Sequence, residues 1–211
     1  MIAVVDCGSG NLQSVTKAFE HLGAETILTS DPAYLAAAEK IVLPGQGEFG
    51  NVRRQIDARG LTGVLLDRAR EADDGGRPFL GICVGLQVLF ERSAESPGVE
   101  GLGVWTGGCA RFDIEALGRE GHKIPHMGWS PVEPAPAAAG SVYGGVPAGA
   151  YFYFVHSYVV EPAEDSLVAL RAEYGRPFAA ACARRRLFGS QFHPEKSQAG
   201  GLAILKAFVD L

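Results

Sequence analysis

The chain has 211 residues, of which 47% are hydrophobic and 20% are charged, and its formal net charge is −5. A chain of this length can bury a substantial core, and we expect a single domain spanning residues 1–211. The acidic balance argues against a nucleic-acid-binding surface, because such a surface needs a net basic face to neutralise phosphates.

The first half of the chain alternates apolar strands with helices. Strands are expected at Ile2–Val5, Glu25–Leu28, Ile41–Leu43 and Phe79–Ile82. Helices are expected over residues 12–22, from Pro32 after Ser30 and Asp31, and over Val52–Ala72 with interruptions at Gly60 and Gly63. Strands that are apolar throughout and alternate with helices indicate an α/β fold, with a mostly parallel central sheet flanked by helices.

The second half contains short β-rich segments separated by proline, glycine and charged turns. These segments are Tyr151–Val160, Leu167–Glu173 and Phe178–Phe192, and we expect them to add an antiparallel part to the sheet. The triplet Arg184–Arg186 is expected to be a hairpin turn. Pro131–Gly149 is rich in proline, alanine and glycine and is expected to form a surface loop. A closing helix is expected after Gly200 and Gly201.

The N-terminus and the cysteines predict a cytoplasmic protein. The opening MIAVVDCG lacks the basic and apolar regions of a secretory signal, and no apolar run approaches the roughly 20 residues that span a bilayer. We expect no membrane partner. The four cysteines, Cys7, Cys83, Cys109 and Cys182, form no Cys-x-x-Cys pair that would favour a zinc site, so free thiols are expected and no metal or cofactor is implied.

Cys83 is the strongest candidate for a nucleophile. It lies between Gly81 and Gly85, where a buried strand meets an apolar helix. Flanking glycines permit the tight turn of a nucleophile elbow, which holds the reactive side chain in a strained conformation at a helix N-terminus. The alternative is that Cys83 packs in the core as a small hydrophobe, as buried cysteines commonly do.

A nucleophilic cysteine needs a general base, and His193 is the best candidate. Of the five histidines, it alone sits with a carboxylate in a compact polar unit, Gln191-Phe192-His193-Pro194-Glu195. The imidazole would take the thiol proton, and Glu195 would orient the ring and stabilise its charged form. A lone His-x-Glu is common in loops, so the argument depends on its combination with the cysteine elbow.

These two motifs resemble those of the class I, or triad, glutamine amidotransferases, and the resemblance covers essentially the whole chain. It implies that Cys83 attacks the side-chain amide of L-glutamine to form a glutamyl thioester. His193 would protonate the departing ammonia and then activate water. No cofactor is implied.

Pro44-Gly45-Gln46-Gly47 is a second glycine-rich loop at a strand end, and its amides can approach an oxyanion. The alternative is a sharp turn required by the parallel sheet. By resemblance, the loop corresponds to a Pro-Gly-Val-Gly loop that supplies the oxyanion donor, with Gln46 here in place of valine. The same resemblance implies a glutamine pocket formed by Gly45, Gln46, Gly47, Val84, Gln87, Glu95, Ser157 and Tyr158.

Three further segments resemble the glutaminase subunits of imidazole glycerol phosphate synthase. They are residues 6–12, Lys123-Ile124-Pro125-His126-Met127-Gly128-Trp129, and Tyr153-Phe154-Val155-His156-Ser157-Tyr158. The resemblance implies a heterodimer with a (β/α)₈-barrel cyclase of histidine biosynthesis, which receives the ammonia. It places Asn11, Lys123, His126, Met127 and Trp129 at the interface or along the ammonia passage.

Two rival interpretations remain. Another triad glutaminase, serving pyridoxal phosphate or anthranilate synthesis, would share the cysteine elbow, but the Pro125–Trp129 segment discriminates against it. A noncatalytic α/β binding protein would use Cys83 structurally. An electrophilic glutamine analogue separates this second rival from a glutaminase, because only a glutaminase nucleophile should be labelled.

Overall fold

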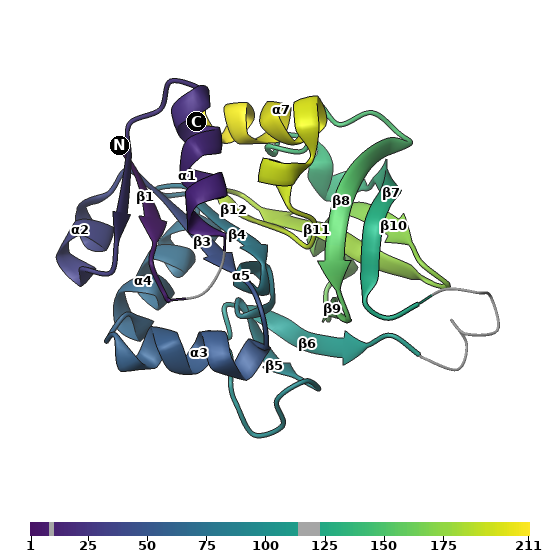
Figure 1. Cartoon of the computed structure of the whole chain (residues 1–211), viewed down its shortest axis with the longest axis horizontal. Coiled ribbons are helices and arrows are strands. Elements are labelled where there is room, and N and C mark those ends of the chain that lie inside the picture. The colour runs from purple at the N-terminus through teal and green to yellow at the C-terminus, as the bar shows by residue number, and fades with distance from the viewer. Residues whose placement is uncertain (9–10, 114–122) are drawn as a thin grey trace.

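The computed structural model of the protein describes residues 1–8, 11–113 and 123–211 (Figure 1). Within these residues, a nine-stranded sheet has the order β2-β1-β3-β4-β12-β11-β10-β7-β8, and a separate three-stranded sheet has the order β5-β6-β9. The large sheet has a parallel half and an antiparallel half, which meet at β12. The predicted α/β class, with an added antiparallel segment, is confirmed.

In the part of the chain that the structure describes, the parallel half takes four of its strands from the start of the chain and one, β12, from near the C-terminal end. It consists of β1 (Ile2–Val5), β2 (Thr26–Thr29), β3 (Lys40–Gly45), β4 (Phe79–Cys83) and β12 (Leu187–Ser190). Every residue of β1, β4 and β12 is buried, as expected for strands with both faces covered. The strands β3 and β4 pair in parallel up to Gly45 and Cys83, so the loops after both strands emerge at the same edge.

The helices cover both faces of this half (Figure 1). They are α1 (Leu12–His21), α2 (Pro32–Ala37), α3 (Phe49–Ala58), α4 (Thr62–Asp73), α5 (Val84–Gln87) and α7 (Gln198–Val209). Figure 1 shows α1 beside α7, with α3 and α4 on the other side of the sheet. The rings of Phe19 and Phe208, 6.1 Å apart, join α1 to α7.

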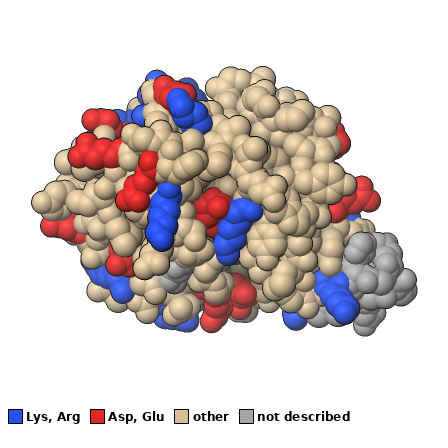
Figure 2. Space-filling view, turned by 45° about the horizontal axis from the view of Figure 1, so that its top comes forward, with Lys and Arg blue, Asp and Glu red and all other residues tan. Residues whose placement is uncertain are grey.

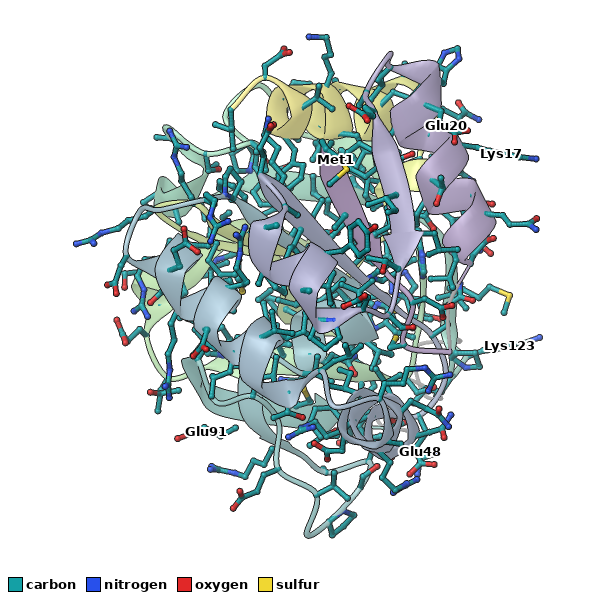
Figure 3. All side chains as sticks on the ribbon, turned by 90° about the vertical axis from the view of Figure 1, so that its left-hand side faces the viewer. Met1, Lys17, Glu20, Glu48, Glu91 and Lys123 are labelled. Atoms are coloured by element: carbon teal, nitrogen blue, oxygen red, sulfur yellow. The ribbon has the colours of Figure 1, made fainter. Side chains whose placement is uncertain are left out.

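The sequence explains where these helices begin and which face they bury. The Asp31 side chain accepts a hydrogen bond from Ala33 N at 2.8 Å, and Pro32 occupies the first turn of α2, as predicted. In α1, Val15 and Phe19 are buried. Lys17 and Glu20 of the same helix extend outward (Figure 3), so the helix is amphipathic.

The antiparallel half carries the later part of the chain. It contains β7 (His126–Pro134), β8 (Ala150–His156), β10 (Val168–Glu173) and β11 (Pro177–Arg184). The predicted hairpin between β11 and β12 is confirmed, with Arg185 at φ 51° in the turn. Three short 3₁₀ turns, Pro136–Ala138, Asp165–Leu167 and Pro194–Lys196, complete this region.

The three-stranded sheet was not expected from the sequence. It consists of β5 (Phe90–Ser93), β6 (Trp105–Arg111) and β9 (Tyr158–Pro162). The expected single segment Tyr151–Val160 divides at Ser157, where the chain leaves the large sheet and enters the small one. The indole of Trp105 anchors the small sheet by donating a hydrogen bond to Asp73 Oδ1 at 2.9 Å.

Three local predictions were wrong. Gly63 lies inside α4 and does not interrupt it, whereas the break before α4 occurs at Gly60, with φ 66°. Residues 131–149 are not simply a surface loop, because β7 continues to Pro134 and Val142 and Tyr143 are buried. The last helix begins at Gln198, before the two glycines. Glycine and proline lower the local preference for a helix or strand but do not exclude one.

Charged side chains do not form a continuous band on the face shown in Figure 2. Acidic and basic side chains are interspersed there, and a broad area carries neither sign. Across the residues the structure describes, no helix is both long enough and apolar enough to cross a membrane.

Candidate active site

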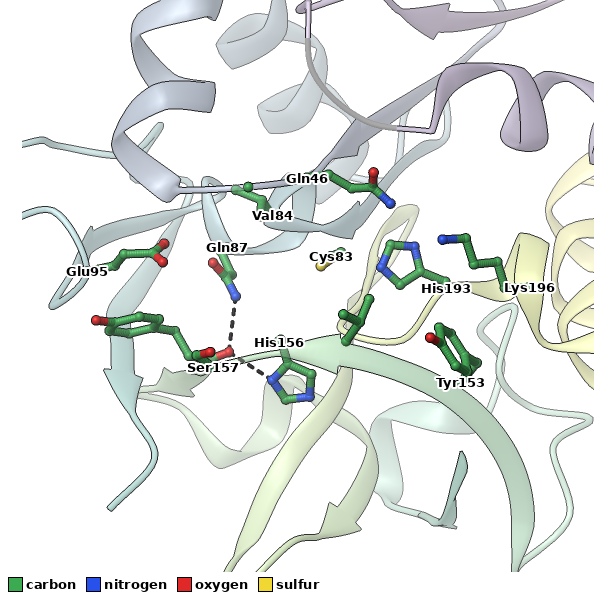
Figure 4. Close-up of a pocket in the computed structure, with 13 residues that line it drawn as sticks. Gln46, Cys83, Val84, Gln87, Glu95, Tyr153, His156, Ser157, His193 and Lys196 are labelled. Atoms are coloured by element: carbon green, nitrogen blue, oxygen red, sulfur yellow. Dashed lines mark hydrogen bonds between the residues drawn. The ribbon is translucent and has the colours of Figure 1, made fainter. Parts of the chain in front are cut away.

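A cavity of about 340 Å³ opens at the edge of the sheet where β3 and β4 end (Figure 4). Ligands of open α/β sheets bind at this edge, outside the carboxyl ends of the parallel strands. Five segments meet there, from the β3 loop, the β4–α5 junction, the β5–β6 loop, the β8–β9 junction and the Pro194 turn. The cavity is lined by Gln46, Gly47, Cys83, Val84, Gln87, Glu95, Tyr153, Val155, His156, Ser157, Tyr158, His193 and Lys196.

Cys83 has the strained backbone of a nucleophile elbow. It is the last residue of β4, its φ is 56° and its ψ is −111°, and only 4% of it is exposed. A non-glycine residue at positive φ is unfavourable unless the surrounding structure enforces it. The surrounding structure does so through Gly85, because any Cβ at that position would overlap the Leu43 carbonyl oxygen on β3.

The helix that follows Cys83 is shorter than expected. α5 contains only Val84–Gln87, a single turn, so little macrodipole is available to stabilise a thiolate. Stabilisation of the sulfur must therefore come from individual side chains and amides around it.

His193 and Glu195 form a buried pair beside the cysteine. Nδ1 of His193 lies 2.9 Å from Glu195 Oε1, and both side chains are almost fully buried. A carboxylate only accepts hydrogen bonds, so Nδ1 carries the proton and the other ring nitrogen, Nε2, faces Cys83 (Figure 4). Nε2 makes no hydrogen bond of ordinary geometry within the described residues.

The electrostatics of the pair favour a charged imidazole. Burial alone lowers the pKa of His193, but the interactions with Cys83 and Glu195 outweigh burial and raise the pKa to about 10. The imidazole is therefore charged at neutral pH. A charged imidazole beside a cysteine sulfur is the arrangement that favours the thiolate form of a nucleophile.

The other cysteines lack these features. Burial raises the pKa of Cys109 to about 12 and raises the pKa of Cys182 further, so both thiols stay neutral. Cys7 is buried, with its sulfur 3.6 Å from the Pro44 carbonyl oxygen. Cys83 is the cysteine that lines the cavity.

The predicted oxyanion loop lies against the nucleophile. Gly45 pairs with Cys83 in the β3–β4 register, and Gln46 and Gly47 line the cavity. Gly47 has φ 92°, a conformation that side chains other than glycine rarely adopt. Its backbone can therefore present an amide at a position that an ordinary residue would not reach.

Glu95, in the turn after β5, holds the start of α3, which follows the predicted oxyanion loop. Its Oε2 accepts a hydrogen bond from Phe49 N at 2.8 Å, at the start of α3. Burial raises the pKa of Glu95, and nearby Glu48 adds to this effect, although the Phe49 hydrogen bond opposes it. The carboxyl group lines the cavity, where it offers an anionic acceptor.

Gln87 lines the cavity but is already held by the protein. Its Nε2 donates to the Tyr158 carbonyl oxygen at 3.1 Å and to Gln191 Oε1 at 3.2 Å. Both N–H groups are thus used internally, and Oε1 remains for a ligand. Ser157 and Tyr158 border the cavity at the junction between β8 and β9.

The structure also brings unpredicted residues into the cavity. Tyr153 and Val155 line it together with Ser157, as the period of two along β8 would have indicated. Lys196, directly after Glu195, lines the cavity on the same side as Tyr153, with its Nζ 6.0 Å from the centre of the Tyr153 ring (Figure 4). Among the residues described, no cluster of three or more histidine, cysteine or acidic side chains is arranged to hold a metal ion.

The predicted interface residues divide into exposed and buried ones. Met127 is 62% exposed and Trp129 is 43% exposed, and Lys123 points outward (Figure 3). Asn11 caps α1 through a hydrogen bond from Ser14 N. His126, in contrast, is only 2% exposed and lies behind that surface. Ser9 and Gly10 of the first motif lie outside the described residues.

His126 and His156 form a buried pair. Because of this pair, we expect the free energy of unfolding to decrease in acid. Their rings are joined by an Nδ1–Nε2 contact of 3.1 Å. Burial, together with the nearby His126 and His193, lowers the pKa of His156 to about 3, although a hydrogen bond to Tyr158 opposes this effect. A histidine with a lowered folded-state pKa stabilises the fold above its unfolded pKa, and this stability is lost as pH falls.

We therefore expect the unfolding free energy to decrease from pH 6.5 towards pH 3, by at most about 1.4 kcal/mol per pH unit from this group. The His156→Phe variant should show a shallower decrease in urea unfolding measured across this range. His21→Phe, at the exposed end of α1, removes a histidine away from the pair and should keep the wild-type slope. Equal slopes for all three proteins would contradict the assignment.

The chain is similar in sequence to known glutamine amidotransferases. Residues 3–211 match the family model of the class-I glutamine amidotransferases. The HisH subunit of imidazole glycerol phosphate synthase from Dechloromonas aromatica is 49% identical, with 99% of this chain and 95% of that protein aligned. The HisH subunit from Methanothermobacter thermautotrophicus is 44% identical, with 100% and 98% aligned.

Solved structures share the fold at lower sequence identity. A crystal structure described as a glutamine amidotransferase superposes with a TM-score of 0.73 at 16% identity, covering 100% of this chain and 99% of that one. A chain in the structure of PurLQS from Thermotoga maritima gives a TM-score of 0.67 at 18% identity, covering 99% and 97%. This chain belongs to the class-I glutamine amidotransferase family, within the group of imidazole glycerol phosphate synthase HisH subunits.

Proposed function

We propose that the protein is the glutaminase subunit of imidazole glycerol phosphate synthase. It would hydrolyse L-glutamine at Cys83 and deliver ammonia to a cyclase subunit in histidine biosynthesis. The observation that carries this proposal is the strained Cys83 elbow beside the buried His193–Glu195 pair, in a chain similar to HisH subunits over its full length. The reaction would take place in the cytoplasm, where its free cysteines remain reduced.

The geometry supports a thioester mechanism. The Cys83 thiolate would attack the side-chain amide carbon of glutamine, and the oxygen would become an oxyanion beside the Gly45–Gly47 loop. Protonated His193 would give its proton to the leaving nitrogen, releasing ammonia and a glutamyl thioester. Neutral His193 would then take a proton from water as the water attacks the thioester, which releases glutamate and restores the thiolate–imidazolium pair.

The cavity offers groups suited to each end of glutamine. The Glu95 carboxylate is suited to the positively charged α-amino group, and Gln87 Oε1 offers a further acceptor. We propose that Gly45, Gln46, Gly47 and Val84 surround the reacting amide, and that Ser157 and Tyr158 border the remainder of the ligand.

The exposed face near the cavity is the proposed docking surface for a (β/α)₈-barrel cyclase. Met127 and Trp129 present apolar surface there, and Asn11 and Lys123 add polar groups. His126 would support this surface from behind. A closed interface would keep water away from the ammonia. This matters because water protonates ammonia to ammonium, which is not a nucleophile. The cyclase would use the ammonia to form imidazole glycerol phosphate and an aminoimidazole carboxamide ribonucleotide.

Covalent labelling tests the glutaminase proposal. An electrophilic glutamine analogue, added with the cognate cyclase present, should modify Cys83 stoichiometrically and block glutamate release. Mass spectrometry of the digested protein should find Cys7, Cys109 and Cys182 unmodified, which provides an internal control within one sample. Absence of a Cys83 adduct would refute the glutaminase proposal and favour a noncatalytic α/β binding protein.

A further inference from the structure

Gln191 is a buried polar residue to which the thioester mechanism assigns no task. It follows β12 directly, it is 0% exposed, and it lies two residues before His193. Its Nε2 lies 3.7 Å from Cys83 Sγ, within hydrogen-bonding distance for a sulfur acceptor. A buried amide aimed at the nucleophile calls for a functional explanation.

The orientation of the Gln191 amide follows from a neighbouring backbone carbonyl. The Tyr158 carbonyl can only accept, so the Gln87 atom 3.1 Å from it must be Nε2. The second N–H of that nitrogen points to Gln191 at 3.2 Å, so the Gln191 atom facing it must be the oxygen. The Gln191 NH₂ group is therefore the end that faces the sulfur.

The buried histidine pair fixes the same carbonyl from the other side. His156 Nδ1 lies 3.0 Å from the Tyr158 oxygen and must donate to it. In neutral His156, Nε2 is then an acceptor, and it receives the Nδ1–H of His126. The second nitrogen of His126 lies 2.8 Å from Ser130 Oγ on β7. A chain of hydrogen bonds, in which the Tyr158 carbonyl accepts from His156 and from Gln87, thus joins β7, β8, β9, α5 and the nucleophile.

We propose that Gln191 is a further catalytic residue, whose side-chain amide donates a hydrogen bond to the Cys83 thiolate. The proposal deepens the glutaminase function and rests on Cys83 being the nucleophile. The one-turn helix α5 provides little dipole, so this donor and protonated His193 are the groups that hold negative charge on the sulfur. Gln87 is the positioning residue, since it leaves Gln191 only one end with which to face the cysteine.

A donor to a charged sulfur has a measurable effect on reactivity. A hydrogen bond to an ionised group favours that form over the neutral one. Loss of such a bond should shift the pH midpoint of Cys83 alkylation upward by about one unit, which is about a tenfold lower thiolate fraction below the midpoint.

The test is the pH dependence of iodoacetamide alkylation at Cys83, followed by mass spectrometry of the Cys83 peptide in the full-length chain. Gln191→Met keeps the side-chain length and removes the donor. Gln191→Glu keeps an oxygen for Gln87 and replaces the donor with a second oxygen, so its upward shift should be larger. Ser190→Ala is the matched control, because the neighbouring hydroxyl is buried on β12 and has no hydrogen-bond partner within the described residues.

An upward shift in every Gln191 variant that retains its circular dichroism spectrum, with an unshifted Ser190→Ala midpoint, supports the proposal. A wild-type midpoint in any such Gln191 variant overturns it. Iodoacetamide needs no glutamine pocket, so the readout is independent of substrate. Failure of the glutamine analogue to label Cys83 would instead refute the glutaminase function itself.

Discussion

Replacing Cys83 with alanine is expected to abolish glutamine-dependent product formation and to leave ammonium-dependent formation by the cyclase intact. The methyl group cannot form a thioester, so glutamine turnover should fall by at least about 10⁴-fold. Alanine keeps the Cβ of Cys83 and removes only the sulfur, so the cavity wall should change little in shape. Added ammonium bypasses only the step that Cys83 performs.

The measurement is product formation by the reconstituted heterodimer with glutamine and, separately, with ammonium salts at high pH. Cys182→Ala is the matched control, since it removes a buried thiol from β11 away from the cavity and should retain both activities. Loss of the ammonium-dependent activity in the Cys83 variant would contradict the proposed division of labour. Unchanged glutamine-dependent activity would contradict the role of Cys83.

Local patterns in the sequence were sufficient to predict the parallel sheet and to single out the candidate residues that the structure brings together at the cavity. Strands β1, β3 and β4 are short, apolar runs. Both faces of these strands are buried, so their sequences are apolar throughout and the strands could be predicted. The Cys83 elbow and the His193–Glu195 pair are each encoded within a few residues. Their mutual approach is a consequence of β4 and β12 pairing in parallel, which the α/β class makes natural.

Non-local interactions were not predictable in the same way. The bond between Gln87 and Gln191 joins residues 104 positions apart, and neither residue type signals the other. The pairing of β7 with β8 faces His126 against His156, but no local periodicity gives that register. The division at Ser157 was missed because both halves, Tyr151–His156 and Tyr158–Val160, favour strands. Only the structure, in which β8 and β9 belong to different sheets, reveals that the segment is divided at Ser157.

Replacing Gly85 with alanine is expected to destabilise the fold by about 3 kcal/mol or more and to abolish glutamine turnover. The added Cβ would overlap the Leu43 carbonyl oxygen, which belongs to a central strand held by β1 on one side and β4 on the other. Neither backbone can yield without displacing Cys83 from the His193 imidazole. A displacement of about 1 Å at a reacting atom can cost about 10²-fold in rate.

Gly63→Ala is the matched control, because it adds the same methyl group inside α4, where no atom lies within 4 Å of the new Cβ. Alanine favours a helix over glycine, so this variant should gain about 0.5–1 kcal/mol and keep full activity. Urea unfolding and glutamine-dependent turnover of both variants provide the comparison. If Gly85→Ala unfolded at the wild-type urea concentration and remained active, β3 would not enforce the positive φ of Cys83. The strain at the nucleophile would then need another origin.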